Sequence, residues 1–160
     1  MTPSDLEQRL KKGFAETPRP RPDFIVAHQC EECSRIRDDF SPFDWTSVPG
    51  NIFEHHWDAF PLFTPQAFRY YLPGYILHVI KNSGSEVAGW MLPKLIDLGQ
   101  PDDFWAQRRS LLTEAEEAVI REFLHFVYES PDFVRLRADS YDALVCWGER
   151  PNSTVESGLR

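Results

Sequence analysis

The chain has 160 residues, of which 42% are hydrophobic and 14% aromatic, enough for one folded domain with a substantial core. Its formal net charge is −8, so it lacks the clustered positive charge that binding to nucleic acid requires. No uncharged apolar run approaches the length of a membrane-spanning helix, and we expect no membrane partner. The negative charge lies in residues 23–147, whose net charge of −10 would suit a basic protein partner, although solubility also explains it.

The cellular compartment is suggested by the cysteines and by the first residues. There are three cysteines at uneven spacing, which does not form a disulfide framework. Residues 1–14 lack the apolar centre of a signal peptide. We therefore expect a cytoplasmic protein.

Residues 1–22 are expected to form a first helix and a proline-rich connector. Ser4 and Glu7 have the spacing of a capping box, and the helix would bury three residues at four-residue intervals, Leu6, Leu10 and Phe14. The sequence TPRPRP at 17–22 is typical of an extended, polyproline-like segment.

Two further helices are predicted before residue 61. The segment 28–40 places its apolar residues on one side at helical spacing. In the segment 51–60, a projection at about 100° per residue puts one set of residues on a single buried face. That set is Ile52, Phe53, His56, Trp57 and Phe60.

The strongest helix signal follows at residues 64–82. Thr64 is a favourable N-cap and Pro65 a favourable first helical residue. Apolar residues occupy both sides, so this central helix should be covered on both faces. Pro73 removes one backbone hydrogen bond and should kink the helix.

The second half of the chain is also expected to be helical. Helical patterns cover residues 86–98, 113–129 and 131–147, with a short turn at 102–109 and a second capping box at Thr113 and Glu116. No segment alternates with the period of a strand. We predict an all-α fold, a compact irregular bundle of six or seven helices, with residues 1–22 as N-terminal helix and connector, 23–148 as a single helical domain and 149–160 as a disordered tail.

The sharpest chemical signal is the pattern His28-x-Cys30-x-x-Cys33. Two thiolates at this spacing can bind one zinc ion, and His28 could add a ligand. His56, on the predicted buried face of its helix, could supply a fourth. The alternative is that Cys30 and Cys33 are core thiols and that His56 is a hydrogen-bonded core histidine.

Two other kinds of chemistry rank below zinc. A redox-active C-x-x-C normally lies at a helix start inside a fold that contains strands, and no strands are predicted. The run Glu54-His55-His56-x-Asp58 contains the usual proton carriers, but helical projection separates the two histidines, which favours a solvated surface. We predict no catalytic residue.

Two stretches carry a resemblance to a known family. They are HQCEEC at residues 28–33, followed by Trp45, and the segment FTPQAFRYYLP at 63–73. They resemble a family of uncharacterised bacterial proteins, a domain of unknown function with H-x-C-x-E-C and (L/F)-(S/T)-P-x-A-F-x-Y-Y-L-P motifs. The resemblance implies a small bacterial cytosolic protein and no established catalytic residue or cofactor.

From these observations we expect an acidic binding protein that acts on a basic protein partner. A structural zinc site at His28, Cys30, Cys33 and His56 is the alternative.

Overall fold

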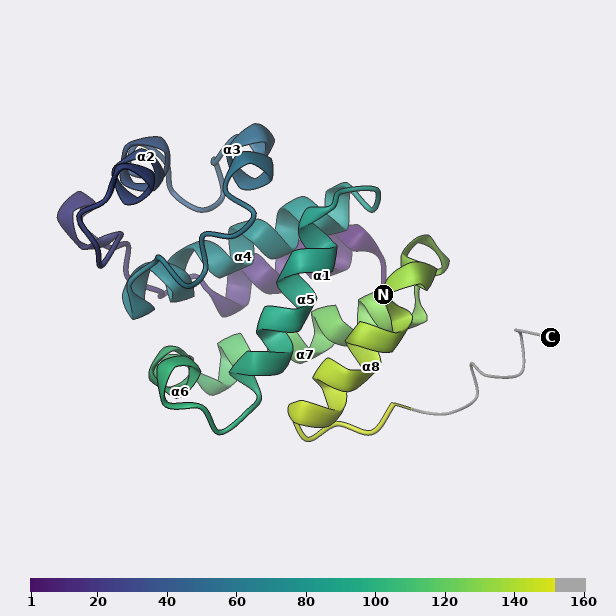
Figure 1. Ribbon diagram of the computed structural model, residues 1–160. Coiled ribbons are helices and arrows are strands. Elements are labelled where there is room, and N and C mark those ends of the chain that lie inside the picture. The colour runs from purple at the N-terminus through teal and green to yellow at the C-terminus, as the bar shows by residue number, and fades with distance from the viewer. Residues whose placement is uncertain (152–160) are drawn as a thin grey trace.

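The computed structural model describes residues 1–151, which form eight α-helices and two short 3-10 helices (Figure 1). The α-helices are α1 (Pro3–Gly13), α2 (Glu31–Phe40), α3 (Gly50–His55), α4 (Pro65–Lys81), α5 (Val87–Leu98), α6 (Asp103–Ser110), α7 (Glu114–Glu129) and α8 (Arg137–Cys146). The 3-10 helices are η1 (Pro22–Phe24) and η2 (Pro131–Leu136). The all-α prediction is confirmed. The segment expected as a short turn at 102–109 is the helix α6, which Asp102 caps through its carboxylate. Most of the tail predicted at 149–160 lies outside the described residues.

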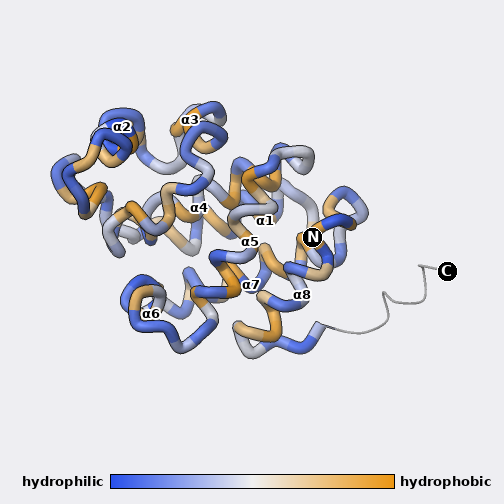
Figure 2. Tube along the Cα trace, viewed as in Figure 1, coloured by the Kyte–Doolittle hydropathy of each residue, from blue (hydrophilic) through white to orange (hydrophobic). Residues whose placement is uncertain are grey.

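Helix α4 lies at the centre of the fold, with α2 and α3 on one side of it in Figure 1 and α6, α7 and α8 on the other. Twelve of its residues are buried, so it is covered on both faces as predicted. Figure 2 shows orange, hydrophobic residues along α4, and further orange segments in α5, α7 and α8. The helix is continuous from Pro65 to Lys81 with Pro73 inside it, and the bend expected at Pro73 stays a prediction.

Helix α1 packs against α4 and α7 and buries Leu6 and Leu10 completely. It begins two residues earlier than the Ser4–Glu7 pattern suggested. Thr2 is the N-cap, its hydroxyl accepts the backbone N–H of Asp5 at 3.1 Å, and Pro3 takes the first helical position. Proline is favoured at that position because its missing N–H has no partner there in any helix.

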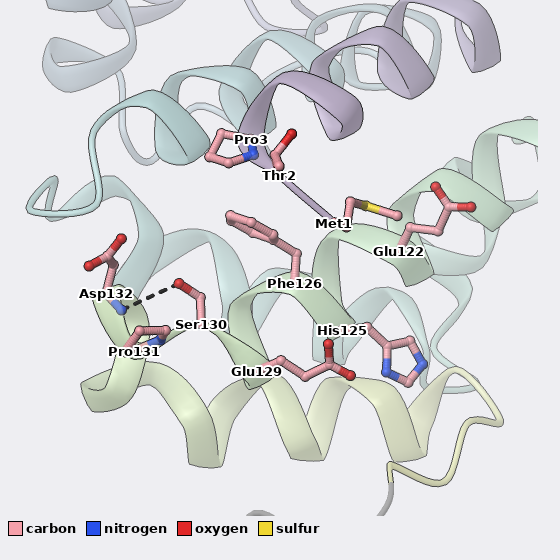
Figure 3. A pocket seen from close by; sticks show the side chains of 10 residues that line it. All are labelled: Met1, Thr2, Pro3, Glu122, His125, Phe126, Glu129, Ser130, Pro131 and Asp132. Atoms are coloured by element: carbon pink, nitrogen blue, oxygen red, sulfur yellow. Dashed lines mark hydrogen bonds between the residues drawn. The ribbon is translucent and has the colours of Figure 1, made fainter.

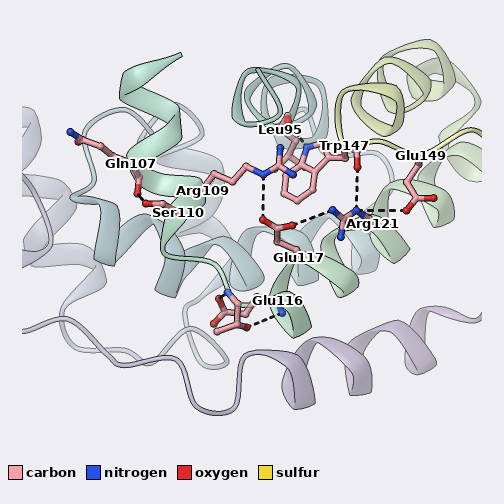
Figure 4. A network of polar contacts seen from close by, with 10 residues as sticks. Leu95, Gln107, Arg109, Ser110, Glu116, Glu117, Arg121, Trp147 and Glu149 are labelled. Carbon is pink, nitrogen blue, oxygen red and sulfur yellow. Dashed lines mark hydrogen bonds and ion pairs between the residues drawn. The ribbon is translucent and has the colours of Figure 1, made fainter. Parts of the chain in front are cut away.

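Helices α6, α7 and α8 are joined by a polar network (Figure 4). Glu117 on α7 accepts hydrogen bonds from Arg109 at 3.3 Å and from Arg121 at 3.1 Å. The Arg109 guanidinium also lies 4.4 Å from the centre of the Trp147 ring, and the indole N–H of Trp147 donates to the Leu95 carbonyl at 2.8 Å. Trp147 therefore ties the end of α8 to both α5 and the network.

One isolated antiparallel bridge, Val26 to Phe63, is the sole β-type pairing within residues 1–151. Beside it, the N–H of Thr64 donates to the Ile25 carbonyl at 3.0 Å and the Thr64 hydroxyl donates to the Phe24 carbonyl at 2.6 Å. These contacts attach the segment before α2 to the start of α4. None of the helices in the described part of the chain has both the length and the apolar character needed to cross a membrane.

Candidate functional site

The two cysteines of the C-x-x-C pattern lie together at the start of α2. Cys30 is the N-cap of this helix, and its sulfur accepts the backbone N–H of Cys33 at 3.3 Å. The side chains differ in exposure, since Cys30 is exposed and Cys33 is completely buried. All three cysteines, including Cys146, are free thiols.

The two thiols have opposite acidity. The pKa of Cys30 is lowered, first by a hydrogen bond from the Cys33 thiol and then by the Cys33 backbone N–H. The pKa of Cys33 is raised, first by burial and then by the same thiol–thiol hydrogen bond, in which Cys33 is the donor. Cys30 is therefore the thiol of the pair that ionises more readily.

The predicted histidine ligands have different surroundings. His28 precedes the helix and is exposed. His56 is buried, with its Nε2 atom 2.7 Å from a carboxylate oxygen of Asp39 on α2. Within residues 1–151, no group of three His, Cys, Asp or Glu side chains is arranged to hold a metal ion. Zinc binding by His28, Cys30, Cys33 and His56 stays a prediction.

The histidine and carboxylate run at residues 54–58 is divided among separate contacts. Glu54 accepts a hydrogen bond from the Ser85 hydroxyl at 2.5 Å and lies 2.7 Å from Nε2 of His78. The Ser85 hydroxyl thus donates to a carboxylate, and this carboxylate is shared with His78.

A hollow of about 500 Å³ lies between the start of α1 and the end of α7 (Figure 3). Two of its polar side chains have structural contacts. Glu122 receives a hydrogen bond from Arg9 at 2.7 Å, and the Ser130 hydroxyl accepts the N–H of Asp132 to cap η2. Among the described residues that line this hollow, no hydrogen bond joins a nucleophile to a base.

Two exposed tryptophans form the most distinctive surface of the molecule. Trp57 follows α3 and Trp90 lies on α5, and their rings are 4.3 Å apart with an angle of 33° between their planes. Their exposed fractions are 38% and 53%, so about a third to a half of each large aromatic side chain is available to a partner. The prediction that Trp57 points inward was wrong, because α3 ends at His55 and the helical projection does not extend to residue 57.

Trp90 was missed, although the sequence contained a signal for it. In α5 the buried residues recur at helical spacing, and they are Val87, Ala88, Met91, Leu92, Leu95 and Leu98. Trp90 lies outside this set, on the side that also carries Lys94 and Asp97. Together with Trp57 it forms an exposed aromatic patch, and such patches mark contact surfaces.

The tryptophan pair forms part of a hollow of about 430 Å³ that is lined by both apolar and charged residues. We call it the tryptophan groove. Its lining residues are Glu32, Trp57, Asp58, Phe60, Pro61, Leu62, Trp90 and Lys94. Glu32 and Asp58 make no ion pair within residues 1–151, whereas Lys94 lies 3.6 Å from Asp97. An adjoining hollow, also lined by Glu32, Trp57 and Asp58, adds Glu31, Arg35 and the two histidines at 55 and 56.

The fold and this surface define a small all-α protein with an acidic, aromatic groove. Comparison with known families shows that residues 2–150 match the "Family of unknown function (DUF6714)", and the chain belongs to this family. Comparisons with curated proteins and with solved structures gave no match.

Proposed function

We propose that this protein is a binding protein whose tryptophan groove takes a basic segment of a protein partner. The observation that supports the proposal is the exposed pair of Trp57 and Trp90, whose rings are in contact at a tilt of 33°. Tryptophan is enriched among the residues that dominate binding energy in protein interfaces, and it is the best aromatic partner for a cation.

The charge around the groove favours a partner with arginine or lysine. Glu32 and Asp58 line the groove, and neither forms an ion pair with another described residue. The protein as a whole carries a net charge of −8. An arginine of the partner could stack on an indole ring and donate hydrogen bonds to one of these carboxylates. The apolar lining residues Phe60, Pro61 and Leu62 suit an apolar side chain next to that arginine.

The experiment is a selection of peptides from a random displayed library on the full chain. We expect enrichment of peptides that combine arginine or lysine with apolar residues. A synthetic peptide of the enriched sequence is then titrated against the protein by calorimetry. Replacing Trp90→Ala should weaken binding by about 2 kcal/mol, which is roughly 30-fold.

Tyr141→Ala is the matched control. Tyr141 is an aromatic residue with an exposed fraction of 44% on α8, away from the groove. Its replacement should leave peptide binding unchanged. Enrichment of acidic peptides, or equal affinities for the Trp90→Ala and Tyr141→Ala proteins, would contradict the proposal.

A further inference from the structure

The cysteine pair has features that the binding proposal does not use. Cys30 is exposed at the first turn of α2, and Cys33 is buried directly behind it. The lack of predicted strands argued against a redox-active C-x-x-C. The structure nevertheless places the pair at a helix start, as such chemistry requires. The ten residues of α2 direct their free N–H groups and the positive end of the helix dipole toward Cys30.

The geometry of the pair is compatible with a disulfide. The N-cap side chain folds over the backbone N–H of the third helical residue, and here that residue is Cys33. The Cys30 sulfur lies 3.3 Å from the backbone nitrogen of Cys33, so it is already placed beside the residue to which it would bond. Cys146 is not a competing partner, because it lies at the end of α8 with its sulfur 3.2 Å from the amide nitrogen of Gln100.

The surroundings of the two thiols also indicate which of them reacts first. Cys30 is exposed and its sulfur accepts the backbone N–H of Cys33 at 3.3 Å at the start of α2, whereas Cys33 is completely buried. An exposed cysteine at a helix start is the one that attacks, and a buried neighbour is suited to the second step.

We propose that Cys30 and Cys33 form a dithiol site that exchanges with disulfides and prefers cationic ones. The Cys30 thiolate attacks one sulfur of the substrate disulfide, whose S–S bond breaks, and the other sulfur leaves with the electron pair as a thiolate. The Cys33 thiol then loses its proton to water and attacks the Cys30 sulfur. The mixed disulfide breaks and the second substrate thiolate leaves. The substrate gains two electrons and the cysteine pair becomes a disulfide.

The preference for a cationic disulfide follows from the two residues after Cys30. Glu31 and Glu32 are both exposed, and only Glu31 has an ion pair in the described residues, at 2.7 Å from Arg35. Glu32 lies in the first turn of α2, two residues after Cys30, so its negative charge is close to the reacting thiol. An anionic substrate is repelled by this charge and a cationic one is attracted. Glu32 also lines the tryptophan groove, but the inference does not require that the groove binds a peptide.

The test uses the full chain, fully reduced, with cystamine as the cationic disulfide and glutathione disulfide as the anionic one. Samples are quenched in acid, alkylated and analysed by peptide mass spectrometry. We expect a Cys30–Cys33 disulfide to form, at least tenfold faster with cystamine. The Glu32→Gln protein should show a smaller preference.

Single replacements separate the two steps. Cys33→Ala should accumulate a mixed disulfide at Cys30. Cys30→Ser should react at least tenfold more slowly, and this protein should fold because serine is a favourable N-cap. Circular dichroism checks the fold of each variant, and alkylation of the native chain by neutral iodoacetamide should modify Cys30 before Cys33 and Cys146.

Three results would overturn the proposal. The first is a Cys30→Ser protein that reacts as fast as the native chain, and the second is Cys146 as the first thiol to react. The third is near-stoichiometric zinc in protein purified without a metal-binding tag, lost in the Cys30→Ser protein, because zinc would then occupy the thiolates.

Discussion

The guanidinium of Arg69 forms a bidentate ion pair with the carboxylate of Glu116. Nε of Arg69 donates to Oε2 and Nη2 donates to Oε1, each at 2.9 Å. Glu116 also accepts hydrogen bonds from the Thr17 hydroxyl and from the backbone N–H of Thr113. The side chain of Glu116 is only 2% exposed and that of Arg69 is 18% exposed. One carboxylate thus connects the segment after α1, the central helix α4 and the start of α7.

Replacing Glu116→Gln should destabilise the protein by about 3 kcal/mol, because removal of one partner leaves a poorly solvated charge without compensation. The measurement is the free energy of unfolding in urea. Glu122→Gln is the control, since Glu122 pairs with Arg9 at the surface and an exposed pair contributes less than about 1 kcal/mol. Equal losses in the two proteins would show that burial does not strengthen the Glu116 contact.

Two helical glycines should respond in opposite directions to alanine. A Cβ atom at Gly74 would lie 2.8 Å from Cζ of Phe53 and 2.9 Å from the Trp45 carbonyl oxygen, so the packing around α4 must move. At Gly89 no heavy atom lies within 4 Å of the added carbon. Gly89→Ala should therefore stabilise the protein by up to about 1 kcal/mol, the difference in helix propensity, and Gly74→Ala should destabilise it. Thermal unfolding of the two variants tests this difference in sign.

The stability of the protein should fall in acid partly through Glu54. Hydrogen bonds from Ser85 and then from His78 lower the pKa of Glu54 from its ordinary value of 4.5. A carboxyl group with a lower pKa in the folded state stabilises the protein above pH 4.5, and this contribution is lost as the pH falls through the folded-state pKa.

Unfolding in urea over a series of pH values measures the contribution of Glu54. The difference in stability between the native protein and Glu54→Gln should be constant near neutral pH and should shrink in acid. Glu86→Gln is the control, since the Glu86 side chain is 80% exposed and its nearest cation, Arg135, is 3.6 Å away. The same acid dependence in both variants would rule out a specific role for the Ser85 and His78 contacts.

The hydroxyl of Tyr75 should contribute to the position of the tryptophan groove. It donates a hydrogen bond to the His56 carbonyl at 2.6 Å, directly before Trp57, in completely buried surroundings. Tyr75→Phe should lower stability by about 1–2 kcal/mol, because the carbonyl loses its partner without access to water. Urea unfolding provides the value, and Tyr141→Phe, at an exposed site, should show no change.

Much of the fold could be predicted from local patterns. Thr64 and Thr113 cap α4 and α7 as expected, and Glu116 completes the second capping box. The adjacency of Cys30 and Cys33 also follows from their spacing. These features depend on residues within one helical turn of each other, which is why the sequence reveals them.

The position of Trp57 could not be predicted in the same way. Neither glycine nor proline follows α3, so nothing local marks its end. His56 instead leaves helical geometry where its carbonyl meets Tyr75 and its ring meets Asp39. These partners are 19 and 17 residues away in the sequence. Contacts of this kind override a helical pattern, and they also divide the 54–58 run among different neighbours.

The packing of α1 against α7 has a consequence for folding during translation. Arg9 meets Glu122 across 113 residues, and Thr17 meets Glu116 across 99. During translation from the N-terminus, the apolar side of α1 is synthesised long before the helix that covers it. Leu6, Leu10 and Phe14 are therefore exposed to aggregation in the nascent chain until α7 has left the ribosome. Because the contacts between α1 and α7 join residues far apart in the sequence, their late formation is expected to limit the rate of folding.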